Sequence, residues 1–284
     1  MKHEPAIAIV GAGNLGTAMA SALVGAGYRV TEIVHRGGAS GRRAKDLAKR
    51  MGARAVKLGS ATLDAGIVWL CVGDSAIARC AAELAKCGTW KGKTAFHASG
   101  ALASSELNAL KQLGAVVASV HPMMTFVRGV RPELKDVIFA TEGDARAVRQ
   151  AQDIARALGS RSVPIVAANK PMYHAFGAFT SPLIIATISA AEQVARKAGL
   201  SSEAARAAIG PILQQTVRNY LEHGAAAAFS GPLVRGDVET VRRHLNVLRA
   251  APEARAAYVA LARIALKKLP GKNKAAIKKL LRAE

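Results

Sequence analysis

Short apolar runs alternate with helix-like segments through the first half of the chain. The runs are residues 6–10, 29–34, 67–72, 94–97 and 115–120, followed by 137–140 and 162–166. Continuous apolar runs of this length are typical of strands buried on both faces of a parallel sheet, and the segments between them suit crossover helices. The first half is therefore predicted to be α/β, with a doubly wound parallel sheet. The last two runs indicate more peripheral strands.

Strand signals stop after Asn169, and the rest of the chain is Ala-rich with helical periodicity. An α/β half followed by an all-α half predicts two domains, residues 1–168 and residues 169–284. Pro171 suits the first turn of a long helix that runs to Lys197. Because this helix is apolar on more than one face, something must cover it, and we expect a homodimer built on the helical domain.

A glycine-rich turn joins the first predicted strand to the first predicted helix. The turn reads Gly11-Ala12-Gly13-Asn14-Leu15-Gly16. A strand, a G-x-G-x-x-G turn and a helix in this order place free backbone N–H groups at a helix N-terminus, where the pyrophosphate of a dinucleotide binds. The first domain is therefore predicted to be a Rossmann domain that binds a nucleotide cofactor through this turn.

The end of the second predicted strand indicates which nucleotide binds. Sites for NAD(H) usually carry an Asp or Glu there, about twenty residues past the glycines. This chain instead has His35, Arg36, Ser40, Arg42 and Arg43. Paired guanidinium donors suit a phosphate monoester, so the loop favours NADP(H) over NAD(H). Two alternatives remain: a basic loop that is only solvated, and Glu32 as the missing acid, against which strand alternation argues.

Three polar clusters follow predicted strands, where the ligand crevice of an open α/β sheet lies. They are Val72-Gly73-Asp74-Ser75, His97-Ala98-Ser99-Gly100 and His121-Pro122-Met123-Met124-Thr125. We expect the first to line the nicotinamide ribose. The other two each place a histidine where a reduced carbonyl or imine needs a proton donor. Alternatively, each histidine caps its strand and satisfies local backbone groups.

The helical half contributes two further polar motifs. Tyr173 and His174 lie at the start of its first long helix, and the seven-residue spacing to Ser181 keeps His174 and Ser181 on one helix face. Arg235, in the Gly- and Pro-containing turn 230–237, could hold a substrate carboxylate by a paired contact. Equally, Arg235 could pair with Asp237 to shape the turn.

The composition limits the classes of molecule that the protein is expected to bind. A formal net charge of +21 over 284 residues attracts anions, but no nucleic-acid motif is recognised, so we expect an anionic small-molecule substrate and no specific nucleic acid. Cys71, Cys80 and Cys87 lack metal-ligand spacing and predict neither a metal site nor a disulfide framework.

The N-terminus leaves no room for a signal peptide, and the longest apolar stretch, 182–191, is too short to span a bilayer. We therefore expect a cytoplasmic protein that binds no membrane.

Five motifs together resemble one protein family. They are G-A-G-N-L-G, H-A-S-G-A-L, H-P-M-M-T-F, Y-H-A-F, and S-G-P-L-V-R-G-D followed by T-V-R-R-H-L. From about residue 5 to about residue 265, the chain resembles the Rossmann-like, short-subunit dehydrogenase-like oxidoreductases, whose C-terminal helical domain has no known function. The resemblance implies a fold related to pyrroline-5-carboxylate reductase and the 6-phosphogluconate dehydrogenase-like proteins, with pairing through the helical domain. It implies no substrate.

The resemblance also implies roles for individual residues. Carried over by position, the cofactor would be bound by Gly11, Gly13, Gly16 and Arg36, and the cleft would be faced by His97, Ser99, His121, His174 and Arg235. The segment His121-Pro-Met is similar to a motif of prephenate dehydrogenases, whose histidine contacts the substrate hydroxyl.

The chain also departs from related patterns. Members of the family often have Ser-Asn where this chain has Ser181-Pro182. The characteristic lysine of β-hydroxyacid dehydrogenases has no convincing counterpart, because Lys170 precedes Pro171 and lacks a Gly-rich lead-in.

These features predict an NADP(H)-dependent oxidoreductase. It would transfer a hydride to or from a small anionic carbonyl, imine or hydroxy compound in the cleft between the domains, with the cofactor supplying the difficult chemistry. His121 or His97 would move the proton, and Arg235 would orient an acidic group. The alternative is a sensor or regulatory protein that binds NADP(H) without turnover, which the missing characteristic lysine favours.

Overall fold

The computed structural model describes residues 5–130 and 132–282, which divide into two compact units. The first unit ends at Ala178 and the second begins at Phe179. Helix α6 (Lys170–Thr180), which we assigned to the helical domain, thus lies mostly in the first unit. The domain boundary at 168/169 stays a prediction.

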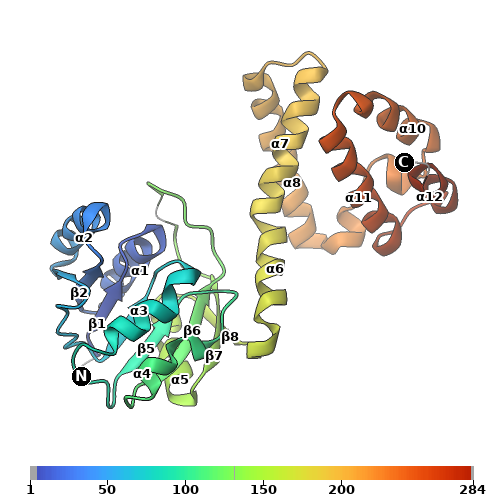
Figure 1. Ribbon diagram of the computed structural model, residues 1–284. Coiled ribbons are helices and arrows are strands. Elements are labelled where there is room, and N and C mark those ends of the chain that lie inside the picture. Colours follow the sequence, from blue (N-terminus) through green and yellow to red (C-terminus); the bar gives the residue numbers. More distant parts are fainter. Residues whose placement is uncertain (1–4, 131, 283–284) are drawn as a thin grey trace. The chain divides into compact units, whose positions relative to one another are not determined.

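An eight-stranded sheet forms the centre of the first unit, in the order β3-β2-β1-β4-β5-β6-β7-β8 (Figure 1). The strands are β1 (Ile7–Val10), β2 (Val30–His35), β3 (Arg54–Lys57), β4 (Ile67–Leu70), β5 (Thr94–His97), β6 (Val116–Pro122), β7 (Ile138–Gly143) and β8 (Arg161–Pro164). Neighbouring strands are parallel except β6 and β7, which run antiparallel. The predicted α/β class with a mainly parallel sheet is confirmed. The antiparallel pair was not predicted, and neither was the edge strand β3, whose two middle residues are half-buried and whose two end residues are exposed.

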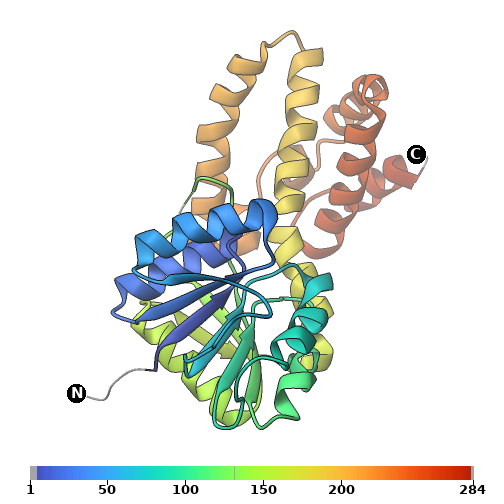
Figure 2. The same ribbon diagram turned by 60° about the vertical axis from the view of Figure 1, so that its left-hand side comes forward.

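Helices cover both faces of this sheet, because its strands carry apolar side chains on both faces. In β1, Ile7 and Ile9 belong to one core cluster and Ala8 and Val10 to another. The first cluster includes residues of α1 (Asn14–Gly25), α2 (Gly38–Met51) and α5 (Ala145–Ala157), and the second includes residues of α3 (Ile77–Leu84) and α4 (Asn108–Lys111). In Figure 2 the blue and yellow-green helices lie on one side of the sheet and the teal helices on the other. The first unit is therefore doubly wound.

The second unit is all-helical, as predicted. Its helices are α7 (Pro182–Lys197), α8 (Ser202–Ala228), α9 (Pro232–Arg235), α10 (Val238–Val247), α11 (Pro252–Lys268) and α12 (Lys274–Arg282). Its core is built by residues of α10, α11 and α12, such as Val241, Leu266 and Ile277. Helix α8 is kinked at Gly224, whose φ of 76° lies in the left-handed region.

The predicted long helix from Pro171 to Lys197 is interrupted at Ser181. Helix α6 ends at Thr180, Ser181 has φ −134° and ψ −83°, and α7 begins with Pro182. Proline lacks a backbone N–H and disfavours the helical conformation in the residue before it, which explains the break. The predicted common face of His174 and Ser181 therefore does not lie on one continuous helix.

Apolar side chains on the helices around this break are largely exposed. The stretch Ala167–Lys197 is long and apolar enough, by length and composition alone, to cross a membrane, and its most apolar window is not buried within the chain. The uninterrupted apolar run 182–191, which is too short to span a bilayer, is only part of this stretch. Ile185 on α7 and Ile212 and Leu221 on α8 are each at least 65% exposed. Exposed apolar surfaces of this kind are typical of sites that another molecule or a membrane covers.

Candidate functional site

The crevice for a ligand lies where the order of strands reverses. From β1 the chain proceeds outward through β2 to β3, and β4 then returns to the other side of β1. Loops at the carboxyl ends of β1 and β4 therefore diverge and leave a crevice between them. The Gly-rich turn follows β1, and Val72 and Gly73 follow β4, so both segments border this crevice.

The three positions of the turn hold glycine for different structural reasons. Gly11 has φ +107°, and a Cβ there would lie 2.6 Å from the Cys71 carbonyl oxygen. A Cβ on Gly16 would lie 1.9 Å from the Gly11 carbonyl oxygen, so α1 can approach β1 only without that side chain. A Cβ on Gly13 would meet no atom within 4 Å. Gly13 thus leaves open space before α1, whose N-terminus has no side-chain cap and offers its N–H groups to an anion.

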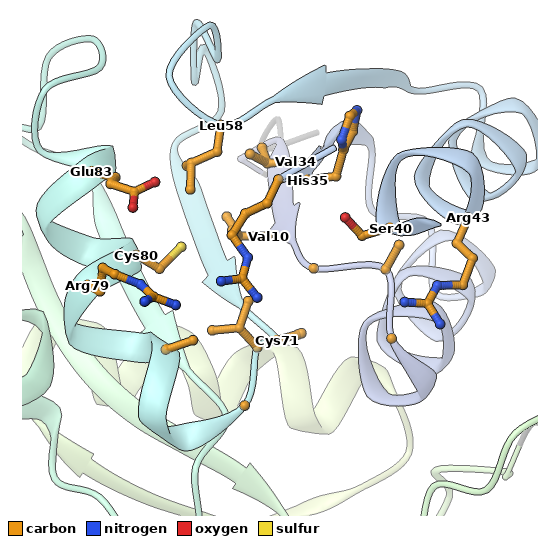
Figure 3. A pocket seen from close by; sticks show the side chains of 17 residues that line it. Val10, Val34, His35, Ser40, Arg43, Leu58, Cys71, Arg79, Cys80 and Glu83 are labelled. Carbon is orange, nitrogen blue, oxygen red and sulfur yellow. The ribbon is translucent and has the colours of Figure 1, made fainter. Parts of the chain in front are cut away.

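A pocket opens from this turn toward the end of β2 (Figure 3). The residues that line it are Val10, Gly11, Ala12, Gly13, Val34, His35, Arg36, Ser40, Arg43, Leu58, Cys71, Val72, Gly73, Ala76, Arg79, Cys80 and Glu83. Apolar side chains form its floor, and three arginines and Ser40 supply donors. Glu83 is the only carboxylate among the lining residues. An apolar floor with a basic rim suits a flat heterocycle that carries phosphate groups.

The structure places most of the predicted cofactor residues in this pocket. Gly11, Gly13, His35, Arg36, Val72 and Gly73 line it. Asn14, Leu15 and Gly16 form the first turn of α1, where the amide Nδ2 of Asn14 donates to the Phe126 carbonyl at 3.1 Å. Arg42 and Asp74 are not among the lining residues, whereas Arg43 is. Helix periodicity decides between Arg42 and Arg43, because adjacent residues of α2 point in different directions.

Arg79 was missed by the sequence analysis. It lies on α3, which follows β4, and it lines the pocket beside Cys80 and Glu83 (Figure 3). The positive charges of Arg36 and Arg79 both act on the Cys80 thiol, so the two guanidiniums approach it from different elements. No motif marks Arg79, and only the crossing of β4 past β1 brings α3 to the end of β2.

Glu32 is used elsewhere, which removes one alternative for the cofactor. Its carboxylate is buried and accepts hydrogen bonds from Arg54 at 2.7 Å, from the Thr62 hydroxyl at 2.8 Å and from the Leu63 N–H at 3.1 Å. It does not line the pocket. The end of β2 therefore presents His35, whose Nδ1 accepts from the Gly37 N–H at 2.9 Å, and no acid.

The two pocket cysteines are unreactive thiols. Burial raises the pKa of Cys71 to about 12. Burial also raises the pKa of Cys80 to about 11, an effect strengthened by Glu83 and opposed by Arg36 and Arg79. A thiolate is the reactive form of cysteine, so both side chains act as apolar lining near neutral pH.

His97 organises the loop that follows β5. Its ring is fully buried, with Nε2 2.9 Å from the Ala103 carbonyl oxygen, and Nδ1 accepts from the Ser99 N–H at 3.2 Å. The Ser99 hydroxyl in turn accepts from the Ala101 and Leu102 N–H groups at 3.1 and 3.0 Å. Because both ring nitrogens are engaged by backbone, we interpret His97 and Ser99 as residues that shape the loop, the alternative that the sequence left open.

His121 lies in a different environment. It is near the carboxyl end of β6, and its Nδ1 lies 2.9 Å from the Tyr173 hydroxyl. The ring of His174 stands nearly perpendicular to that of His121, with centroids 6.4 Å apart. Both rings pack against Gly100, where a Cβ would lie 2.9 Å from His121 Nε2 and 3.0 Å from His174 Cδ2. Gly100, His121, Tyr173 and His174 thus form one cluster, which we call the histidine cluster.

Lys170 lies in the same region, although its sequence context, without a Gly-rich lead-in, does not indicate a role there. It is fully buried, and its Nζ donates to the Ser99 carbonyl at 3.0 Å and to the Ser119 hydroxyl at 2.7 Å. Burial lowers its pKa, against the opposing charges of Glu142 and Asp74. Lys170, Tyr173 and His174 are spaced three and four residues apart on α6, so one helix face carries all three. That spacing was the signal available in the sequence.

Both inward-facing histidines are neutral near pH 7. Burial lowers the pKa of His97 to about 4, which the Ala103 carbonyl opposes and Lys170 strengthens. Burial also lowers the pKa of His121 to about 4, with further lowering by Lys170 and His174 and opposition from Asp74. Burial raises the pKa of Tyr173 to about 12, so its hydroxyl keeps its proton. The hydrogen-bonded pair His121 and Tyr173 is therefore an uncharged imidazole and an uncharged phenol near neutral pH.

We expect these low pKa values to make the protein less stable in mild acid. In the unfolded chain both imidazoles titrate near 6.5, whereas in the folded protein they titrate near 4. The unfolded chain therefore binds protons first, and stability present above pH 6.5 is lost as the pH falls toward 4. Each buried histidine adds at most about 1.4 kcal/mol per pH unit to this slope. Urea unfolding between pH 7.5 and 4.5 should show the loss, and His121→Asn should flatten it; an unchanged slope would contradict the assignment.

Arg235 and Asp237 lie in the second unit, where the turn 230–237 is tightly built. Asp237 caps α10, accepting from the Thr240 N–H at 3.1 Å and from its hydroxyl at 2.7 Å. Gly236 has φ +73°, and a Cβ there would lie 2.7 Å from the Lys272 backbone. Arg235 is exposed at the end of α9. Asp237 thus shapes the turn through Thr240, and a substrate role for Arg235 stays a prediction.

The chain combines two domains that are recognisable in other proteins. Residues 3–122 match the model of a Rossmann-like domain, and residues 137–265 match that of a domain of unknown function, DUF2520. No curated protein sequence matches the chain.

Solved structures share the fold over nearly the whole chain. The structure of a "putative NADP oxidoreductase" from Bacteroides fragilis is 23% identical, covers 92% of this chain and 97% of its own, and has a TM-score of 0.76. A reductive aminase from Aspergillus terreus, in complex with NADPH and ethyl-5-oxohexanoate, is 16% identical, with coverages of 97% and 99% and a TM-score of 0.66. A pyrroline-5-carboxylate reductase from Coxiella burnetii is 17% identical, with coverages of 91% and 97% and a TM-score of 0.60. At this level of identity, the likeness establishes the fold.

Proposed function

We propose that the protein is an NADP(H)-dependent oxidoreductase that acts on a small anionic carbonyl, imine or hydroxy compound. The observation that carries this proposal is a nucleotide pocket whose β2 end bears Arg36, Ser40 and Arg43 and no free carboxylate. The histidine cluster at the ends of β5 and β6 adds proton-transfer groups in the same unit. The solved structures of similar fold support a pyridine nucleotide, because their names include an NADP oxidoreductase and an enzyme complexed with NADPH.

The residues that line the pocket fit the adenosine and phosphate parts of such a cofactor. The open space at Gly13 and the uncapped N-terminus of α1 would receive the pyrophosphate. Arg36, Ser40 and Arg43 would hold the 2′-phosphate, and the apolar floor near Leu58 and Val72 would take the adenine. Strands β4, β5 and β6 lead from this pocket to His121, so the nicotinamide would extend toward the histidine cluster.

The bound nicotinamide supplies hydride transfer, and this chain's own residues supply the proton. His121 is neutral, so it cannot act as an imidazolium near pH 7. If its Nδ1 carries the hydrogen and donates to the Tyr173 oxygen, the phenolic hydrogen is free to be given to a substrate oxygen or nitrogen. His121 would then return its Nδ1 proton to Tyr173 through the same hydrogen bond while its Nε2 takes up a proton from water, so that the imidazole stays neutral.

A non-catalytic NADP(H) sensor is the second candidate. It is favoured by the engagement of both His97 nitrogens with backbone, which leaves one predicted proton donor fewer. Screening NADPH consumption against small 2-oxo acids and cyclic imines separates the two. Turnover that vanishes in a His121 variant supports the enzyme, and tight NADPH binding with no turnover of either class supports the sensor.

Fluorescence titration with NADPH and NADH tests the cofactor assignment directly. The proposal requires tighter binding of NADPH, because only that nucleotide presents a phosphate to the arginines at the end of β2. Equal affinity for the two reduced nucleotides would overturn the preference. Absence of binding to both would overturn the proposed function.

The exposed apolar face of α7 and α8 supports a homodimer. Analytical ultracentrifugation at micromolar concentration should show a dimer, because a second copy would remove Ile185, Ile212 and Leu221 from water. Leu221→Glu should give a folded monomer, since its side chain is 74% exposed within one chain. Leu113→Glu, an exposed leucine in the first unit, is the matched control. A clean monomer of the unmodified protein would contradict the proposal.

A further inference from the structure

Lys170 is a buried cation whose position has an energetic cost. Its side chain is fully buried, and within residues 5–130 and 132–282 no carboxylate forms an ion pair with it. Glu142 and Asp74 act on it only at longer range. Burying an ammonium without an ion-pair partner is energetically unfavourable, and a methionine of similar length would avoid that cost. The lysine must therefore contribute something that an apolar side chain could not.

Its hydrogen bonds connect three elements at the histidine cluster. From the N-terminus of α6, Nζ reaches the Ser99 carbonyl in the loop after β5 and the Ser119 hydroxyl on β6. The Ser119 hydroxyl itself donates to the Ser99 carbonyl at 3.1 Å, which closes the network. The three groups hold the N-terminus of α6 and the end of β6 against one loop.

The network of Lys170, Ser99 and Ser119 adjoins His121. Ser119 is two residues before His121, on the same side of β6. Ser99 immediately precedes Gly100, against which the His121 and His174 rings pack. On α6, Tyr173 is three residues after Lys170 and bonds to His121 Nδ1. A shift of Lys170 would therefore move Gly100, against which the His121 ring packs, and Tyr173, to which His121 is hydrogen-bonded.

Lys170 also brings its charge to the imidazoles. The groups that act on His121 are Lys170 and His174 from α6, which disfavour its protonation, and Asp74 after β4, which favours it. Tyr173 contacts it as a neutral phenol. Lys170 acts in the same direction on His97. Burial is the larger cause for both histidines, and the lysine adds to it.

We propose that Lys170 is a positioning residue: its ammonium group, held by the Ser99 carbonyl and the Ser119 hydroxyl next to His121, keeps His121 uncharged and bonded to Tyr173. This inference rests on the proposed function only in giving His121 a catalytic role. The contacts of Lys170 are present whether or not a nucleotide binds. It assigns the lysine no contact with a substrate, since its side chain is fully covered.

Histidine titration by NMR tests the inference on the full chain without any nucleotide. Protein labelled at histidine Cε1 is titrated from pH 8 to pH 4, and His121→Asn identifies the resonance. In the unmodified protein, His121 should stay neutral to about pH 4. In Lys170→Met and Lys170→Gln, which remove the charge, its midpoint should move upward toward 6.5. Lys170→Arg keeps the charge and should retain the low midpoint, and Lys93→Met, a lysine outside the cluster, should change nothing.

The outcomes separate this role from simple packing. If the Met and Gln variants fold and His121 titrates as before, Lys170 does not set the state of His121 and the inference is wrong. An Arg variant that shifts His121 as far as Met does would also overturn it, because disrupted packing would then be the cause. If no variant folds, the unmodified protein still decides, since a His121 midpoint at or above 6.5 contradicts the inference. NADPH titration of the same samples reports separately on the proposed function.

Discussion

His121→Asn is expected to lower turnover by about 10²–10⁴-fold, the usual contribution of a general acid or base. The imidazole is the one in the described part of the first unit that has a polar side-chain partner, Tyr173, at the carboxyl end of a central strand. Asparagine can hold a hydrogen bond to Tyr173 but cannot pass a proton on. Steady-state NADPH oxidation, with the best substrate found among small oxo acids and imines, gives the ratio.

Two accompanying measurements make the result specific. NADPH affinity should be unchanged, because His121 does not line the nucleotide pocket. Thermal stability near pH 7 should be nearly intact, because the ring is half-buried and the substitute keeps its polarity. His223→Asn, on exposed α8, is the matched control and should behave as the unmodified protein. Full activity in His121→Asn would mean that Tyr173 or another group gives the proton alone, and loss of folding would identify His121 as a structural residue.

Arg36→Ala is expected to weaken NADPH binding by about 1–3 kcal/mol, the scale for a hydrogen bond to a charged group. This corresponds to a rise in Kd of about 5- to 150-fold. NADH, which has no 2′-phosphate, should bind nearly as before. Isothermal titration with both nucleotides measures the difference.

Neighbouring arginines on α2 test the geometry of the pocket. Arg50→Ala, at the exposed end of α2, should leave both affinities unchanged and serves as the control. Arg43→Ala should weaken NADPH more than Arg42→Ala, because only Arg43 lines the pocket. Equal weakening of NADPH and NADH by Arg36→Ala would place this guanidinium on the adenine rather than on the 2′-phosphate. No weakening of either would remove Arg36 from the site.

The sequence by itself determined the parts of this protein that depend on local chemistry. Strand β1, the glycine turn and α1 are adjacent in the chain, so backbone sterics at Gly11 and Gly16 dictate their arrangement. Long apolar runs specified the buried strands, and the loss of such runs after Asn169 specified the helical half. Edge strand β3 was missed because an edge needs no continuous apolar run, and the helix break at Ser181 was missed because helical periodicity continues across it.

Only the tertiary structure decided which side chains meet. Arg79 enters the nucleotide pocket because parallel crossovers bring α3 beside the end of β2, residues that are far apart in sequence. Two histidines that follow successive strands looked equivalent, yet backbone groups engage both nitrogens of His97 while His121 meets a phenol from α6. Lys170 lacked the expected lead-in, but its place on α6 carries it to Ser99 and Ser119. Periodicity indicates which face of a helix is buried, whereas the packing of distant segments determines what that face contacts.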